Sequence, residues 1–462
     1  MTLTPNIPEI STPTDIITTA ETNQEFNWRN CWYPVTFIQD LPRNRPYSFS
    51  LYDEPLVLFR NQEGQLICLS DRCPHRAAKL SDGQIIDGKI ECLYHGWQFG
   101  SGGECLHIPQ LPADGKIPAK ACVQSFFVVE KQGIVWMWAG EANVADEKLI
   151  PTVTDLDNPT VVSSDYMLDL PYDQTYFIEN AIDPSHLYIS HEATLNSRKQ
   201  AQPLEMEVLE TSIHGIRGRY RKTRQYTEHW INLDFIAPNL ITYRSSTPSE
   251  KSKRVGGVAL YSLPLGKGRC RIIVRNYTNF RSRKLKWQPR WMEHWYRDKF
   301  LEEDLPLVVG QQAEVERLGQ SLSSLYLPLK TSDILVVEYR KWLDKYGECL
   351  PFYIGYNTKS LPDKEQPTVN QQPASLDRLR RHTQICSSCS RAHKTAIQLK
   401  QIFVGVAITL ASVAIVIDNN WWQILILSTS LSAVVLAVVA DKVKMKFEQA
   451  YIRQPPRIRQ SL

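Results

Sequence analysis

Two short stretches that combine cysteine with histidine constrain this chain more than any other part of its sequence. The first is Cys73-Pro74-His75-Arg76, and the second, sixteen residues later, is Cys92-Leu93-Tyr94-His95. Two sulfur and two nitrogen donors at this spacing indicate that two loops meet at one metal centre. A Cys₂His₂ zinc site uses the same side chains, but usually with both cysteines before both histidines. Here each stretch holds one of each, which favours a 2Fe–2S cluster whose cysteines bind one iron and whose histidines bind the other.

The residues around these stretches are typical of a small all-β domain. Leu56–Leu69 reads as a β-hairpin, because two apolar runs flank the turn-forming residues Gln62–Gln65. Further apolar runs at 128–129 and 134–138 predict additional strands. We therefore predict a cluster-bearing domain over residues 25–145, preceded by a flexible tail over 1–24. That tail contains no Lys or Arg and no long apolar run, so we expect neither a secretory signal nor a transit peptide.

A second stretch with metal-binding potential runs from Gln174 to His191. It is predicted to be helical on both sides of Pro184, with Asp183 as a cap. Asp183 and His186 are three residues apart and share a helix face, whereas His186 and His191 are five apart and diverge by about 140° on an ideal helix. Both histidines reach one metal only if the helix widens or ends between them. Two histidines and a later carboxylate would form the facial triad of a non-haem Fe(II) oxygenase, with open positions for O₂ and substrate.

The carboxylate has to come from elsewhere in the chain. Alternating apolar residues over 205–280 predict an antiparallel sheet, and a helical region is predicted over 287–320. That region contains the acidic run Glu302-Glu303-Asp304. By charge pattern alone this run is more typical of a solvated helix face than of a metal ligand. The choice of Asp304 as third ligand, with Glu303 as the alternative, therefore depends on the resemblance described below. Residues 146–355 are predicted as one catalytic domain.

The segment after this domain holds a second pair of cysteines. Residues 356–398 are predicted as a linker, polar and Pro-rich at first, that contains Cys386-x-x-Cys389. The pair is a candidate dithiol switch, half of a metal site, or two idle thiols. Because no second pair of cysteines follows it, zinc is not expected within one chain.

Two apolar runs, Ile402–Ile417 and Trp422–Ala440, predict two transmembrane helices over residues 399–440. Trp421-Trp422 would lie in an interfacial aromatic belt. Lysines precede the first run and follow the second in a basic tail over 441–462, whereas the turn between the runs has none. The positive-inside rule then predicts that the catalytic domain and both termini face the cytoplasm or its organellar equivalent, at a thylakoid or inner/plasma membrane.

Composition excludes two broad classes of protein. The formal net charge is only +4, so bulk electrostatics do not indicate a nucleic-acid partner. The ten cysteines do not form the pattern of a secreted disulfide framework. A Gly-rich dinucleotide fingerprint after a strand is not evident, so electrons would have to come from an external protein.

Together these motifs resemble the Rieske non-haem iron oxygenases, and more narrowly the pheophorbide a oxygenase group, which includes chlorophyllide a oxygenase. The broad resemblance rests on the two Cys/His loops and on Asn180-x-x-Asp183-x-x-His186-x-x-x-x-His191. The narrower one rests on His382 followed by Cys386-x-x-Cys389 and two membrane spans, and on Glu338–Trp342. The resemblance implies an α+β protein: an all-β Rieske domain, a helix-covered antiparallel-sheet catalytic domain, and a C-terminal transmembrane hairpin of two helices.

The resemblance also implies roles for individual residues. Asp183 would carry electrons from the Rieske histidine of a neighbouring subunit to His186, so a homotrimer is implied. Ferredoxin or a ferredoxin reductase would be the electron donor. Cys386 and Cys389 would be a redox-regulatory pair. The remaining assignments are a 2Fe–2S cluster on Cys73, His75, Cys92 and His95, and a mononuclear Fe(II) on His186, His191 and Asp304.

The substrate implied by the narrower resemblance is a chlorophyll-derived tetrapyrrole, oxygenated with O₂ at the membrane. Our first choice is pheophorbide a. The alternatives are chlorophyllide a or protochlorophyllide a, or a non-oxygenase Rieske redox component of a membrane complex, as in the chloroplast import machinery. Since no transit peptide is predicted, we expect a cyanobacterium or a similar prokaryote as the source.

Overall fold

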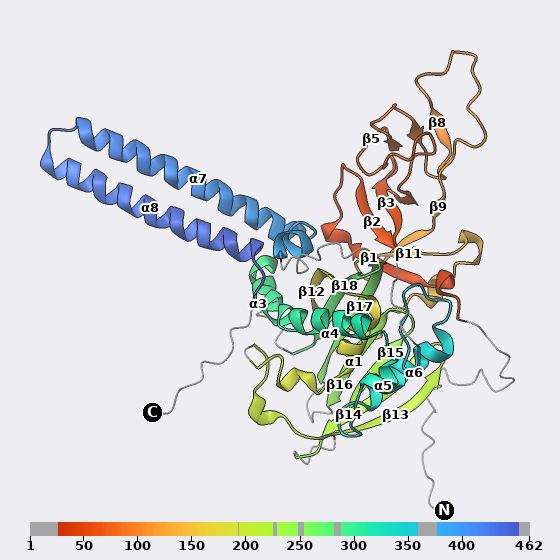
Figure 1. Ribbon diagram of the computed structural model, residues 1–462. Coiled ribbons are helices and arrows are strands. Elements are labelled where there is room, and N and C mark those ends of the chain that lie inside the picture. The colour runs from red at the N-terminus through yellow and green to blue at the C-terminus, as the bar shows by residue number, and fades with distance from the viewer. Residues whose placement is uncertain are drawn as a thin grey trace, which may run out of the picture.

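The structure is a computed structural model that describes residues 26–192, 194–224, 229–247, 254–280, 288–358 and 377–451. A β-rich domain, a large sheet with helices beside it, and a long helical hairpin that projects away from both make up the molecule (Figure 1). The tail predicted over 1–24 and most of the polar segment that precedes the second cysteine pair lie outside the described residues.

The first domain is all-β, as predicted, and consists of three small antiparallel sheets of order β1-β11-β10, β2-β3-β4-β9 and β5-β6-β7-β8. The predicted hairpin is confirmed as β3 paired with β4, and Gly64 in its turn has a φ of +80°, which glycine adopts without strain. The strands are β1 (Trp32–Phe37), β2 (Tyr47–Leu51), β3 (Glu54–Arg60), β4 (Leu66–Ser70), β5 (Gln84–Ile86), β6 (Lys89–Glu91), β7 (Gln98–Phe99), β8 (Cys105–His107), β9 (Ser125–Phe126), β10 (Val128–Lys131) and β11 (Ile134–Trp138).

The second domain contains a seven-stranded antiparallel sheet of order β12-β18-β17-β16-β15-β14-β13. The predicted sheet over 205–280 is confirmed, and β12 joins it from an earlier part of the chain by pairing with β18. The strands are β12 (Val162–Leu170), β13 (Leu204–Ser212), β14 (Gly215–Lys222), β15 (Ile231–Ile236), β16 (Leu240–Thr247), β17 (Arg254–Gly266) and β18 (Arg269–Thr278).

Both faces of this sheet are buried near β12. Tyr166 and Leu168 belong to the core that the helices cover, whereas Met167 between them packs with Trp136 and Trp138 of the first domain. Successive side chains of a strand point to opposite faces, so the alternation places β12 between the helices and the strands β1 and β11. The first domain is thereby joined to the second through a shared apolar core.

The helices of the second domain are α1 (Gln174–Ile182), α3 (Arg290–Glu302), α4 (Leu305–Leu318), α5 (Leu322–Leu325) and α6 (Ile334–Tyr346). The helical region predicted over 287–320 is therefore two helices, α3 and α4, that meet at Glu303 and Asp304. Pro306 explains the break, because a proline clashes with the carbonyl four residues earlier but is tolerated in the first turn of a new helix. The break presents Asp304 at the junction of two helices instead of on a continuous helical face.

The C-terminal hairpin consists of α7 (Ser387–Val416) and α8 (Asn420–Glu448), which extend side by side away from the body (Figure 1). Both helices are long and apolar enough to cross a membrane, and only 11% and 22% of their most apolar windows are buried. The buried residues in the apolar part of the two helices are small, among them Ala407, Ala414 and Ala433, as is usual where membrane helices approach closely. Within the segment predicted as a linker, a π-helical turn, η8 (Leu379–Thr383), leads into α7.

Candidate active site

The two loops that carry the first metal-binding motif are tight turns stabilised by their own backbone. The backbone amide of Cys73 donates to the carbonyl of Ala78 (2.8 Å), and that of Cys92 donates to the carbonyl of Trp97 (2.9 Å). Gly96 has a φ of +74°, and a Cβ there would lie 2.9 Å from Pro109 Cγ, so this position requires glycine. Both cysteines are buried at the base of these loops.

The two histidines of these loops lie against each other, with ring centroids 4.4 Å apart. Trp97 stacks on the ring of His75 at 4.7 Å, which fixes its orientation. His75 Nδ1 is buried and has no hydrogen-bond partner, as expected of an atom whose partner is a metal ion. The residues present therefore fit a 2Fe–2S cluster, with two thiolates on one side and two imidazoles on the other.

The second motif brings His186 and His191 together because the helix ends before them. Helix α1 stops at Ile182, and His186 begins a single 3₁₀ turn, η6 (His186–Tyr188). The two rings lie 5.3 Å apart. Their Nε2 atoms lie 3.5 Å and 3.0 Å from Asp304 Oδ2, respectively. The angular separation on an ideal helix is thus avoided, and three side chains face one point.

Glu303 and Asp304 occupy different positions around this point. His191 Nδ1 donates to Glu303 Oε2 (3.2 Å), which also accepts from Thr194 Oγ1 (2.7 Å). The bond holds His191 with Nε2 free to bind a metal, the usual role of a carboxylate behind a metal-binding histidine. Both carboxylates have one buried oxygen without a hydrogen-bond partner, Glu303 Oε1 and Asp304 Oδ1, but it is Asp304 Oδ2 that faces the Nε2 atoms of both histidines. This geometry supports Asp304 as the third ligand and Glu303 as the residue that positions His191.

Asp183 lies behind His186 on the side away from Asp304. His186 Nδ1 donates to the backbone carbonyl of Asp183 (2.6 Å), and the Asp183 carboxylate Oδ2 lies 3.6 Å from the same nitrogen. The other carboxylate oxygen accepts from the backbone amide of Ser185 (2.7 Å). The Asp183 carboxylate is thus fixed next to one iron ligand, in a position suited to a relay.

The pKa values around this point show how strongly it attracts a cation. Burial opposes protonation of His186, but hydrogen bonds to Asp183 and Asp304 raise its pKa to about 10. Burial opposes ionisation of Asp304, but hydrogen bonds with both histidines hold its pKa below its usual range. In the metal-free protein His186 therefore carries a proton that a metal ion has to displace.

Iron uptake by the metal-free protein is expected to depend on pH. Since the His186 pKa is about 10, the histidine is protonated below that pH and must lose one proton to bind metal. The apparent Fe(II) affinity should rise by about tenfold per pH unit between neutral pH and about pH 9. Anaerobic Fe(II) titration of protein depleted of its mononuclear iron measures this slope, and an affinity independent of pH would contradict it.

A cavity of about 400 Å³ lies beside this site. Asp183, His186 and Asp304 line it, together with apolar side chains such as Leu307 of α4 and Val336 of α6 and polar ones such as Glu179. The open side of the metal site therefore faces a space of the size and character typical of a small-molecule pocket.

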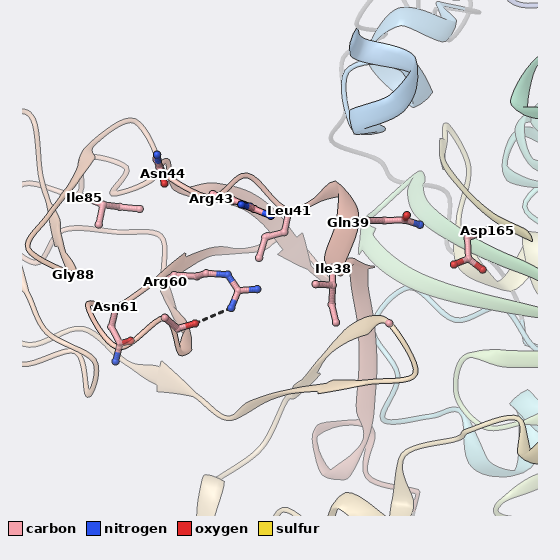
Figure 2. A pocket seen from close by; sticks show the side chains of 12 residues that line it. Ile38, Gln39, Leu41, Arg43, Asn44, Arg60, Asn61, Ile85, Gly88 and Asp165 are labelled. Atoms are coloured by element: carbon pink, nitrogen blue, oxygen red, sulfur yellow. Dashed lines mark hydrogen bonds between the residues drawn. The ribbon is translucent and has the colours of Figure 1, made fainter. Parts of the chain in front are cut away.

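A larger cavity, of about 1000 Å³, lies elsewhere, where the first domain meets the sheet (Figure 2). It is lined by Arg43, Arg60, Asn61 and Asp165, among others, and contains none of the predicted metal ligands. Arg60 in its wall is held by a 2.8 Å bond to the carbonyl of Gly64. Without a reactive group in its wall, this cavity is a poorer candidate for the site of chemistry.

Cys386 and Cys389 are buried at the start of α7, and both are free thiols. The sequence motif relates His382 to this pair but not His294; the structure places both residues, His294 from α3 and His382 from η8, against the two thiols. His294 precedes the pair by 92 residues and belongs to no sequence motif that we identified, so no local signal indicated this contact.

Comparison with known proteins agrees with the two centres. The family model "Rieske [2Fe-2S] domain" matches residues 31–127, and the model "Pheophorbide a oxygenase" matches residues 235–321. The chain is 34% identical to Protein TIC 55, chloroplastic, of Arabidopsis thaliana, covering 88% of this chain and 80% of that protein. It is 31% identical to the chloroplastic pheophorbide a oxygenase of Arabidopsis thaliana, covering 85% and 78%.

A solved structure of dicamba monooxygenase bound to dicamba shares the fold, with a TM-score of 0.58 and 23% identity over 69% of this chain and 97% of that one. The described residues supply donors for both a 2Fe–2S cluster and a mononuclear iron. The likeness to TIC 55 extends through most of both chains. The protein is therefore an oxygenase that belongs to the Rieske non-haem iron oxygenases, in the group that contains pheophorbide a oxygenase and TIC 55.

Proposed function

We propose that this oxygenase is anchored in a membrane by α7 and α8 and oxygenates a chlorophyll-derived tetrapyrrole, with pheophorbide a as the first choice. The observation that carries the proposal is the complete set of His186, His191 and Asp304, of which His186 and Asp304 line a cavity of about 400 Å³. A protein that only carries electrons does not need a second iron site with an open side. Chlorophyllide a or protochlorophyllide a is the alternative substrate, since chlorophyllide a oxygenase of Arabidopsis thaliana is 30% identical over 70% of this chain.

The C-terminal hairpin supports an amphiphilic substrate that is delivered from a lipid bilayer. Where α7 and α8 meet α3, a cavity of about 640 Å³ is lined mainly by apolar side chains, including Trp291, Phe403 and Phe447. Chlorins partition into bilayers, so a membrane-anchored enzyme meets them at high local concentration. By the positive-inside rule we place the catalytic domain and both ends of the hairpin on the cytoplasmic side of the membrane or its organellar equivalent.

The side chains around the iron position would perform distinct tasks. When bound, the mononuclear iron supplies the activation of O₂. His186, His191 and Asp304 would hold it from one side and leave its other side to the cavity. Glu303 keeps His191 in the required tautomer, and the carbonyl of Asp183 does the same for His186.

The electron path would run between subunits. We assign the Asp183 carboxylate as the link between His186 and a Rieske histidine of a neighbouring subunit in a homotrimer. Leu93 and Tyr94, which precede His95, are 61% and 60% exposed. Two exposed apolar side chains beside the cluster are suited to contact with a second protein, either the neighbouring subunit or the ferredoxin that donates electrons.

Metal analysis followed by turnover tests the proposed function. Detergent-purified full-length protein should hold three irons and two sulfides per chain, counted from one cluster and one mononuclear iron. Each candidate substrate is then supplied with reduced ferredoxin and O₂ in a separate, parallel assay. Pheophorbide a should be converted to a ring-opened product. Consumption of chlorophyllide a alone would change the substrate but keep the mechanism. Two irons without turnover would contradict the proposal.

Substitution of each acidic neighbour identifies the third iron ligand. Asp304→Asn should lose the mononuclear iron, because it replaces the negatively charged carboxylate that both Nε2 atoms face by a neutral amide. Glu303→Gln should keep the iron but bind it about 10- to 100-fold more weakly, the usual effect of losing the partner behind a metal-binding histidine. Iron content and Fe(II) affinity distinguish the two variants, and the reverse pattern would assign the ligand to Glu303.

A further inference from the structure

The four side chains His294, His382, Cys386 and Cys389 form a compact group in the described part of the chain. Their donor atoms all lie within 4.8 Å of one another. All four residues are fully buried, at 0% exposure. They come from α3, from η8 and from the start of α7, so only the tertiary structure brings them together.

Four of the six distances between the donor atoms, from 3.1 to 3.5 Å, are close to the edges of a coordination tetrahedron. His294 Nδ1 lies 3.1 Å from His382 Nε2 and 3.4 Å from Cys389 Sγ. Cys386 Sγ lies 3.5 Å from His294 Nδ1, and Cys389 Sγ lies 3.3 Å from His382 Nε2. Metal–sulfur bonds of about 2.3 Å and metal–nitrogen bonds of about 2.0–2.1 Å place tetrahedral neighbours about 3.3–3.8 Å apart. Donors this close leave room for one ion and not for a two-iron core.

The outer ring nitrogens determine what the inner ones can do. His294 Nε2 lies 2.9 Å from the carbonyl of Asp165, and His382 Nδ1 lies 2.6 Å from that of Met167. A carbonyl only accepts, so both outer nitrogens must carry the proton. In neutral imidazoles the two inner nitrogens, 3.1 Å apart, then present lone pairs to each other. Backbone carbonyls behind metal-binding histidines are a usual way to fix this tautomer.

We propose that His294, His382, Cys386 and Cys389 bind one zinc ion in a closed tetrahedral site. Two thiolates balance the charge of Zn²⁺, and the two cysteines lie at the start of α7, where the helix dipole favours negative charge. The surrounding side chains include the apolar Trp291, Trp295 and Phe447, together with one buried carboxylate, that of Asp298, whose Oδ1 lies 3.9 Å from His382 Nε2. Four protein ligands and no exposed face define a structural site and not a catalytic one.

The site would join the membrane hairpin to the catalytic domain. One ion would link α7 to α3, while hydrogen bonds from both histidines extend the link to β12. From His294, helix α3 continues to Glu302, two residues before Asp304, a length of about 12 Å at 1.5 Å per residue. The zinc site would therefore hold the same helix whose end presents the iron ligand.

Zinc content and X-ray absorption of the wild-type protein test the proposal without any variant. The full-length chain, purified anaerobically in detergent without chelator, should hold one zinc per chain in addition to its iron. The zinc edge should report two sulfur and two nitrogen neighbours at about 2.3 Å and about 2.0–2.1 Å. Under native conditions both thiols should resist alkylation. Protein without zinc, whose two thiols are alkylated or joined in a disulfide, would overturn the proposal and favour a redox-active pair.

Single substitutions then assign the ligands. His294→Gln and Cys389→Ser should each reduce zinc from one per chain to near zero while the visible spectrum of the Rieske cluster is retained. His393→Gln and Cys349→Ser are matched controls that should keep the zinc, since His393 is bound to Glu448 and Cys349 is an exposed thiol. Zinc retained in His294→Gln would overturn the proposed ligand set. These outcomes do not depend on the identity of the organic substrate.

Discussion

Replacement of Asp183 by asparagine is expected to reduce O₂-dependent turnover by about 10- to 100-fold and to leave both metal centres in place. The substitution keeps the shape of the side chain, and the backbone carbonyl that accepts from His186 Nδ1 is unchanged. The amide oxygen can still accept from the amide of Ser185. What the variant loses is the negative charge 3.6 Å from His186 Nδ1, which is the group assigned to electron transfer.

Iron content and the visible spectrum first establish that both centres are present in this variant. Turnover is then measured, together with the rate at which a pre-reduced cluster is reoxidised in the presence of substrate and O₂. A slow reoxidation with intact centres is the expected result. Asp146→Asn is a matched control, because Asp146 accepts from the amide two residues ahead (2.9 Å), as Asp183 does, but lies on the surface. Wild-type turnover in Asp183→Asn would exclude a relay through this carboxylate.

Replacement of His186 by alanine should remove the mononuclear iron and abolish turnover, while the Rieske spectrum is retained. One of the three donors around the iron position is lost, and Asp304 and His191 alone do not complete a facial triad. The iron content should fall from three to two per chain. The cluster should survive because its loops are stabilised by their own backbone hydrogen bonds and by the stacking of Trp97 on His75.

Two comparisons make this experiment decisive. His214→Ala, on the exposed turn between β13 and β14, should keep three irons and full turnover. Loss of both centres in His186→Ala would indicate misfolding, and the less disruptive His186→Gln would then replace it. Three irons in a folded His186→Ala variant would exclude His186 as a ligand of the mononuclear iron.

The cluster loops, the first hairpin and the membrane helices could be predicted from the sequence because each depends on local information. The Cys73 and Cys92 loops close through backbone bonds between residues five apart in the chain. The β3–β4 hairpin follows from two apolar runs around one turn, and α7 and α8 follow from long apolar runs. Periodicity and composition report such features directly, since they decide element type and burial one segment at a time.

Other features depended on where segments meet. Glu303 and Asp304 are adjacent and both acidic, so sequence could not decide which one faces His186; the break before Pro306 and the bond from His191 to Glu303 separate them in space. The sequence by itself determined that this chain builds a Rieske cluster, places two histidines near an acidic helix, and ends in an apolar hairpin. Only the tertiary structure brought His294 to His382 and the cysteine pair, because packing α3 and α7 beside β12 joins residues that no local pattern relates.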